Sequence, residues 1–206
     1  MQFPPIYSFP PLYTRQPNQI TRNKQIDTWS QLIITTAQSL SAWEIDQKGK
    51  FKVSNDKDKG NLHKSSIFHN EEINRSVSQM FIDEILSSML SKAQLLVKDV
   101  DPKRKIQIVS SNNNDSGNTE LQFFVLWKSL DAWGSMLLEW FETCGKLSQV
   151  VTLYELSMGD ESIGWEFHGM PSGLLVECLK VLVRRGRATL IRDEDAGDRY
   201  IAVKVV

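Results

Sequence analysis

The sequence predicts an α+β fold in which two small helix-and-hairpin domains follow an extended, proline-rich N-terminal arm. The first 20 residues hold five of the seven prolines and show no helical periodicity. After them, one order of elements occurs twice: helix, short strand, short helix, longer helix and hairpin. The length of 206 residues suits two small domains, because domains commonly run to about 100–150 residues.

The first helix is expected to begin near Thr21, a residue type that caps helix N-termini. Apolar residues at steps of three and four then mark one helical face: Ile26, Trp29, Ile33, Ala37 and Leu40. A short strand is expected at residues 42–45, followed by a polar loop over residues 46–64. Helix should resume at Asn70 or Glu71 and continue to about Ala93, with a buried face of Phe81, Ile85, Leu86, Met89 and Leu90.

Residues 94–100 and 120–127 are rich in β-forming side chains, so they predict a hairpin. Between them, residues 101–119 contain a run of Ser, Asn, Asp and Gly at residues 110–118. That composition cannot bury a core, so this segment is expected to be a mobile tip.

The second domain is expected to start with a helix capped by Asp131 and closed by Gly145. Residues 150–156 predict a strand, and Pro171 opens a further helix that ends at Gly186. Residues 188–191 and 200–206 flank an acidic turn and predict a second hairpin. The apolar faces of the two helices carry Trp133, Leu137, Trp140, Phe141 and Cys144, and Leu175, Cys178, Leu179 and Leu182.

This repeated order is the winged-helix pattern. The sequence therefore predicts two tandem winged-helix domains, at residues 20–130 and 131–206, preceded by an arm at residues 1–19.

The arm contains two copies of Pro-Pro-x-Tyr, at residues 4–7 and 10–13. Proline favours polyproline II, which has three residues per turn, so a spacing of six places Tyr7 and Tyr13 on one side, about 19 Å apart. Large rings on a stiff segment are typical of a docking peptide. The candidate partner-binding residues are Pro4, Pro5, Tyr7, Phe9, Pro10, Pro11, Leu12 and Tyr13. Two alternatives stay open: a strap on the chain's own domain, and a ligand of WW domains.

Winged helices often bind DNA, but the charges disfavour that function here. Residues 1–130 carry 16 basic and 13 acidic groups, and residues 131–206 carry 8 and 12. The third helix of the first domain presents Asp83 and Glu84, which would repel phosphates. Basic side chains cluster only at residues 103–105 and at Arg184, Arg185 and Arg187. DNA binding is kept as the alternative function.

Nothing in the sequence indicates an enzyme, a metal site or a cofactor. His63, His69 and His168 are scattered, and no phosphate-binding loop or nucleophile motif occurs. Cys144 and Cys178 are expected to be buried free thiols. No apolar run of about 18 residues predicts a membrane span, and no signal peptide opens the chain.

The sequence resembles a known family at both ends. The resemblance rests on Phe9 to Asn18, followed by Thr21-Arg22, Lys24-Gln25 and Trp29, then on Trp133-Gly134, Trp140, residues 152–156 and residues 166–169. These segments are similar to the small, duplicated subunit of ESCRT-II, the vacuolar protein sorting-associated protein 25 family. Residues 46–69 and 101–119 are longer than the family's core requires.

The resemblance implies two tandem winged helices and a non-catalytic assembly function. It implies that the Pro-Pro-x-Tyr segments bind the two larger ESCRT-II subunits, and that the second winged helix recruits the ESCRT-III initiating subunit. The expected process is sorting of ubiquitinated cargo into multivesicular endosomes. The expected localisation is cytoplasmic, peripheral on the endosomal membrane.

Overall fold

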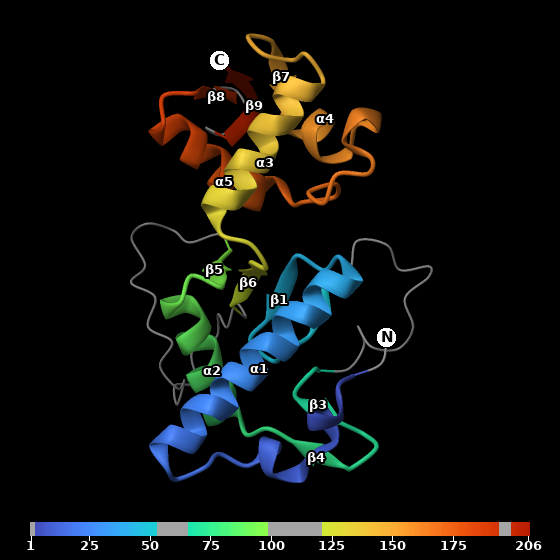
Figure 1. The fold of residues 1–206 in the computed structure, drawn as a ribbon, viewed down its shortest axis with the longest axis vertical. Helices are drawn as coiled ribbons and strands as arrows, with labels where there is room; N and C mark the ends of the chain where they lie inside the picture. The colour runs from blue at the N-terminus through green and yellow to red at the C-terminus, as the bar shows by residue number, and fades with distance from the viewer. Residues whose placement is uncertain (1–2, 53–65, 99–120, 194–198) are drawn as a thin grey trace, which may run out of the picture. The chain divides into compact units, whose positions relative to one another are not determined.

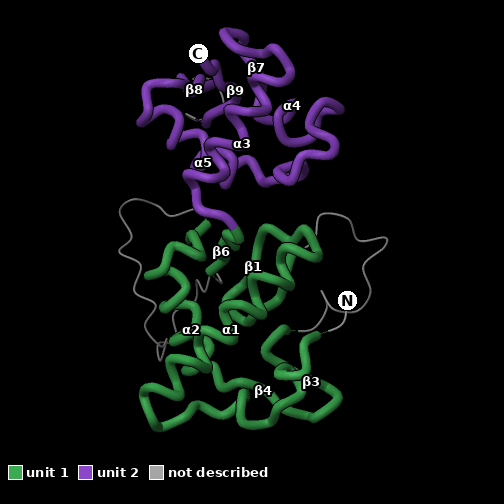
Figure 2. Tube along the Cα trace, viewed as in Figure 1, with its two compact units in different colours: residues 1–127 green, residues 128–206 purple. Residues whose placement is uncertain are grey.

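The computed structural model describes residues 3–52, 66–98, 121–193 and 199–206. The chain divides into two compact units, Met1–Trp127 and Lys128–Val206, coloured separately in Figure 2. Each unit combines helices with an antiparallel sheet, which confirms the α+β class. The N-terminal segment belongs to the first unit and is not an extended arm.

The described residues of unit 1 form 3-10 helices, α-helices and antiparallel strands (Figure 1). The helices are η1 (Pro5–Ser8), η2 (Pro10–Tyr13), α1 (Gln19–Leu40) and α2 (Gln79–Ser91). The larger sheet has the order β2-β1-β6-β5, from β1 (Glu44–Asp46), β2 (Phe51–Lys52), β5 (Leu95–Val97) and β6 (Gln122–Val125). β3 (His69–Asn70) and β4 (Arg75–Ser76) form the smaller one.

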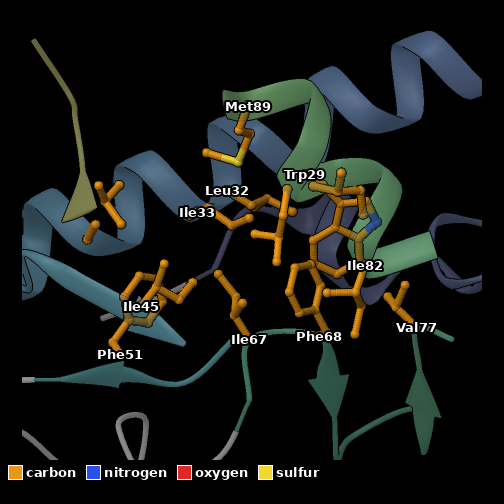
Figure 3. Packing of buried hydrophobic residues seen from close by; sticks show 14 of the residues in the cluster. Trp29, Leu32, Ile33, Ile45, Phe51, Ile67, Phe68, Val77, Ile82 and Met89 are labelled. Atoms are coloured by element: carbon orange, nitrogen blue, oxygen red, sulfur yellow. The ribbon is translucent and has the colours of Figure 1, made fainter. Parts of the chain in front are cut away.

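Helix α1 begins before the predicted residue. Asn18 caps it by accepting a hydrogen bond from the Thr21 N–H at 3.1 Å, so Thr21 lies inside the first turn. The predicted apolar face is confirmed, because Ile26, Trp29, Ile33, Ala37 and Leu40 are all buried. Figure 3 shows Trp29, Leu32 and Ile33 of α1 packed among side chains from α2 and the strands.

The hairpin predicted after residue 94 is confirmed, since β5 pairs with β6 antiparallel from Leu95↔Val125 to Val97↔Phe123. The predicted tip at residues 101–119 lies outside the described residues.

The helix predicted from Asn70 is wrong: residues 69–76 form the β3–β4 hairpin, and helix starts only at Gln79. The Asn70 side chain accepts hydrogen bonds from the N–H groups of Glu72 at 2.9 Å and Ile73 at 3.4 Å. This local bonding competes with helix formation and favours a turn. Within the described residues of unit 1, the expected short helix is therefore replaced by a hairpin.

Unit 2 follows the predicted order more closely. It comprises α3 (Leu130–Thr143), β7 (Val150–Thr152), α4 (Leu153–Met158), η4 (Asp160–Ser162), α5 (Ser172–Arg184), β8 (Ala188–Asp193) and β9 (Arg199–Val205). The three strands form one sheet in the order β7-β9-β8. The elements run in the predicted order of helix, strand, short helix, longer helix and hairpin, and the predicted hairpin is present as β8–β9.

Two boundaries in unit 2 differ from the prediction because of hydroxyl caps. Ser129, not Asp131, caps α3 by accepting from the Ala132 N–H at 3.1 Å. The strand predicted to residue 156 stops at Thr152, whose hydroxyl accepts from the Glu155 N–H at 3.0 Å and starts α4.

Both cysteines are free thiols, but only Cys178 is fully buried; Cys144, at the end of α3, is half-buried. Burial raises the pKa of the Cys178 thiol to about 12, so this thiol stays protonated and behaves as a small core residue. Gly134 of α3 lies against α5, because a Cβ built on it would meet the Cβ of Val181 at 3.3 Å.

Candidate functional site

The N-terminal segment is folded as two consecutive 3-10 turns. The Tyr7 N–H donates to the Pro4 carbonyl at 2.9 Å, and the Leu12 N–H donates to the Phe9 carbonyl at 3.0 Å. The polyproline II prediction is therefore wrong. Proline fixes φ near −65°, which both conformations share, and leaves ψ free to be set by tertiary contacts.

The two tyrosine rings lie in the core of unit 1, where Tyr7 is 7% exposed and Tyr13 is 4% exposed. Their ring centroids are 6.0 Å apart, in place of the roughly 19 Å expected for polyproline II. Both rings pack edge-on against Trp29, at 5.4 Å from Tyr13 and 6.3 Å from Tyr7. Phe68 contacts the same indole at 5.2 Å. Both tyrosine rings therefore pack on the chain's own unit 1, as the strap alternative predicts.

Both phenol groups donate hydrogen bonds to backbone carbonyls. The Tyr13 hydroxyl donates to the Tyr7 carbonyl at 2.7 Å, which joins the two copies of the motif. The Tyr7 hydroxyl lies 3.0 Å from the carbonyls of both Ile67 and His69, at the start of the β3–β4 hairpin. Burial raises the pKa of both tyrosines, strongly for Tyr7, so both hydroxyls remain donors near neutral pH.

Helix α1 holds the second turn through two buried donors. The Gln25 amide donates to the carbonyls of Leu12 at 2.7 Å, Thr14 at 2.9 Å and Pro11 at 3.2 Å. The Trp29 indole N–H also donates to the Leu12 carbonyl, at 3.1 Å. Gln25 is 6% exposed and Trp29 is fully buried, so these bonds are shielded from water.

The hairpin holds the first turn through Asn70, which is 3% exposed. Its side-chain N–H donates to the Tyr7 carbonyl at 3.1 Å, while its oxygen caps the hairpin turn. Gln25, Trp29 and Asn70 are called the clamp below.

The clamp was not predicted from the sequence. Gln25 could have been found from the sequence, because it lies four positions before Trp29 and so on the same buried face of α1. A polar residue on that face needs a hydrogen-bond partner. Asn70 could not have been found in this way, since the sequence predicted a helix start there.

The rest of the motif faces solvent. Phe9 is 52% exposed and Ile6 is 40% exposed, and the four prolines are exposed as well. These six residues are called the proline surface: Pro4, Pro5, Ile6, Phe9, Pro10 and Pro11. The predicted partner-binding set thus divides in two, because Tyr7, Leu12 and Tyr13 point into unit 1 and the remaining five are exposed.

Ion pairs occupy charges on the two helices that could meet DNA. In unit 1, Glu84 of α2 binds Arg15 at 2.6 Å and Arg22 at 3.1 Å. In unit 2, Lys180 of α5 binds Glu177 at 2.6 Å, and Arg185 binds Asp131 at 2.8 Å. The basic residues 103–105 lie outside the described residues.

One serine–histidine pair has an arrangement that suits structure and not catalysis. Ser162 is fully buried, and its oxygen lies 2.7 Å from His168 Nδ1 and 2.7 Å from the Gly159 carbonyl. These two contacts hold Ser162 inside the turn after α4, and its side chain has no exposed surface. Across the four described ranges there is no cluster of three potential metal ligands, and no helix there is long and apolar enough to cross a membrane.

The protein therefore combines helices and sheets in two units. Its candidate docking site is the N-terminal segment, which is folded on unit 1. The chain belongs to the family of ESCRT-II complex subunits, whose model matches residues 6–171. This confirms the resemblance found in the sequence.

Named relatives match along nearly the whole chain. The "Vacuolar protein-sorting-associated protein 25" of Saccharomyces cerevisiae is 47% identical, over 98% of each chain. The protein of the same name from Dictyostelium discoideum is 30% identical, over 98% of this chain and 97% of the relative, and the human one is 26% identical, over 94% and 93%.

Solved structures agree with the sequence relatives. The crystal structure of subunit VPS25 of ESCRT-II is similar with a TM-score of 0.78 at 46% identity, covering 98% of both chains. A chain of the ESCRT-II complex described as VPS22/VPS25/VPS36 gives a TM-score of 0.75 at 45% identity, again over 98% of both.

Proposed function

We propose that this chain is the small, non-catalytic assembly subunit of an ESCRT-II complex that acts in endosomal trafficking. The observation that carries the proposal is the full-length similarity to a chain of the solved VPS22/VPS25/VPS36 complex. By this similarity, the expected partners are two larger subunits related to VPS22 and VPS36. The complex would sort ubiquitinated cargo into multivesicular endosomes from a cytoplasmic, peripheral position on the endosomal membrane.

The proline surface is the proposed docking site for the larger subunits. The clamp fixes the backbone behind it, so little conformational entropy remains to be lost when a partner binds. Phe9 offers a half-exposed ring of the kind that anchors interfaces, and the prolines beside it add rigid apolar area. In this mechanism Tyr7 and Tyr13 support the surface from below and do not insert into the partners.

Replacing Phe9 and Pro10 by alanine tests this site without touching the core. We expect Phe9→Ala with Pro10→Ala to lose copurification with the larger subunits while its melting temperature stays that of the wild type. Tyr154→Ala is the matched control, since it truncates a 77% exposed aromatic residue of unit 2. If the double variant still copurifies in full, the proline surface is not the docking site.

Unit 2 is proposed to recruit the ESCRT-III initiating subunit. It exposes apolar side chains on and after α4, with Tyr154 at 77%, Ile163 at 63% and Met158 at 46%. Residues 128–206 alone should bind that subunit in a calorimetric titration, and Tyr154→Ala should weaken the binding. Binding by residues 1–127 alone would contradict this assignment.

The alternative of DNA binding has little support from the charges. Helix α2 carries no Lys or Arg between Gln79 and Ser91, and at α5 Lys180 and Arg185 are paired with Glu177 and Asp131. A gel-shift titration with random duplex at low salt should show no steep, salt-dependent affinity.

A further inference from the structure

The proposed function leaves one feature of the N-terminal segment unexplained. Pro-Pro-x-Tyr occurs twice within ten residues, yet both tyrosines serve the chain's own core. Proline-rich segments of this kind are ligands of WW domains, which bind them as polyproline II in aromatic-lined grooves. We propose that the two copies are concealed WW-domain ligands, hidden while the segment is docked on unit 1 and bound when it is released.

The tyrosine side chains of both motifs are hidden from a WW domain. A WW domain must surround the tyrosine ring, but Tyr7 is 7% exposed and Tyr13 is 4% exposed. The Tyr13 hydroxyl is bonded to the Tyr7 carbonyl at 2.7 Å, and the Tyr7 hydroxyl is bonded to the backbone of residues 67–69. Neither ring can enter a second groove without leaving the one it occupies.

The backbone is the second obstacle. Each copy closes i→i+3 hydrogen bonds, from Tyr7 N–H to Pro4 and from Leu12 N–H to Phe9, which polyproline II lacks. Docking on a WW domain therefore requires both turns to open. The apparent affinity is the intrinsic affinity multiplied by the fraction of molecules that are open.

The hydrogen bonds of the clamp help to set the fraction of molecules in which the segment is released. Gln25 donates to the backbone carbonyls of Leu12, Thr14 and Pro11. Asn70 donates to the Tyr7 carbonyl and also interacts with the Tyr13 hydroxyl. Neither residue is part of the Pro-Pro-x-Tyr sequences at residues 4–7 and 10–13. Substituting them opens the segment and leaves the ligand intact, which separates concealment from recognition.

The first measurement compares the intact chain with its own segment. A peptide of residues 3–15 should bind a WW domain of Pro-Pro-x-Tyr specificity, measured by fluorescence anisotropy. The intact chain should bind the same domain at least about a hundredfold more weakly, a difference of about 2.7 kcal/mol. A peptide that does not bind, or an intact chain that binds within a few-fold of the peptide, overturns the proposal.

The second measurement opens the clamp. Gln25→Ala with Asn70→Ala in the full chain should speed hydrogen exchange at the Tyr7 and Leu12 amides and tighten WW binding about tenfold or more. Adding Pro4→Ala and Pro10→Ala, two exposed positions, should abolish the gained binding because both motifs are lost. Exchange that stays slow, or fast exchange without tighter binding, overturns the proposal. Neither readout depends on copurification with the larger subunits, so the two proposals fail separately.

Discussion

Truncating Tyr13 distinguishes a docked segment from a free one. The ring is 4% exposed and packs edge-on against Trp29 at 5.4 Å and Tyr7 at 6.0 Å. Removing a buried aromatic side chain typically costs about 3–5 kcal/mol, from lost burial and the cavity left behind. We therefore expect Tyr13→Ala to lower the free energy of unfolding of unit 1 by about 4 kcal/mol.

Tyr13→Phe separates the ring from its hydroxyl. This substitution keeps the packing and removes the hydroxyl together with its 2.7 Å hydrogen bond to the Tyr7 carbonyl. That carbonyl still accepts from Asn70 at 3.1 Å, so it is not left unsatisfied. The expected loss is about 1 kcal/mol, the usual net contribution of one hydrogen bond.

Urea-induced unfolding of the full chain measures both losses. With a slope of about 2 kcal/mol per molar urea, Tyr13→Ala should lower the unfolding midpoint of unit 1 by about 2 M. Protection of the β8–β9 amides from hydrogen exchange should not change, because unit 2 has its own helices and sheet. An unchanged midpoint for Tyr13→Ala would refute a docked segment and favour an extended arm.

Three further substitutions test the packing and the ionisation of buried groups. Among the described residues, Thr36 has a buried hydroxyl oxygen with no hydrogen-bond partner; Thr36→Val should raise the free energy of unfolding by about 1 kcal/mol, and a loss in a urea titration would contradict this. Gly134→Leu should destabilise unit 2 by about 3 kcal/mol, because even a Cβ there meets Val181 at 3.3 Å; an unchanged melting temperature would show that α3 and α5 are not so close. Burial raises the pKa of Tyr7 above its value of about 10 in the unfolded chain. The neutral hydroxyl therefore contributes its full stability below about pH 10, and this contribution is lost as the pH rises toward the pKa of the folded state. Stability should fall above about pH 10 by up to about 1.4 kcal/mol per pH unit from this residue, and Tyr7→Phe should reduce that slope in urea titrations between pH 8 and 11.

The predictions that succeeded rest on local periodicity. The apolar face of α1 could be recognised from Ile26, Trp29 and Ile33 because a helix repeats every 3.6 residues whatever surrounds it. The β5–β6 and β8–β9 hairpins followed from β-forming runs on either side of polar segments. The family could be recognised for a similar reason, since its resemblance rests on short motifs such as Trp133-Gly134 and residues 152–156.

The conformation of the N-terminal segment was mispredicted because it depends on contacts between distant residues. Proline composition correctly marked residues 4–13 as special, but it left ψ undetermined between polyproline II and a 3-10 turn. That choice was made by partners remote in sequence: Gln25 and Trp29 from α1, and Asn70 from the hairpin, 63 residues beyond Tyr7. Asn70 was itself misassigned to a helix, so its partner could not have been inferred.

The amino-acid sequence alone determined the α+β class, the helical faces, the two hairpins and the family, because all of these depend on residues close together in the chain or on motif spacing. Only the tertiary structure decided which side of the Pro-Pro-x-Tyr segment faces solvent. Burying two phenol rings beside Trp29 and bonding their hydroxyls to backbone carbonyls outweighs the preference of proline for an extended chain, and that balance exists only once α1 and the β3–β4 hairpin are in place.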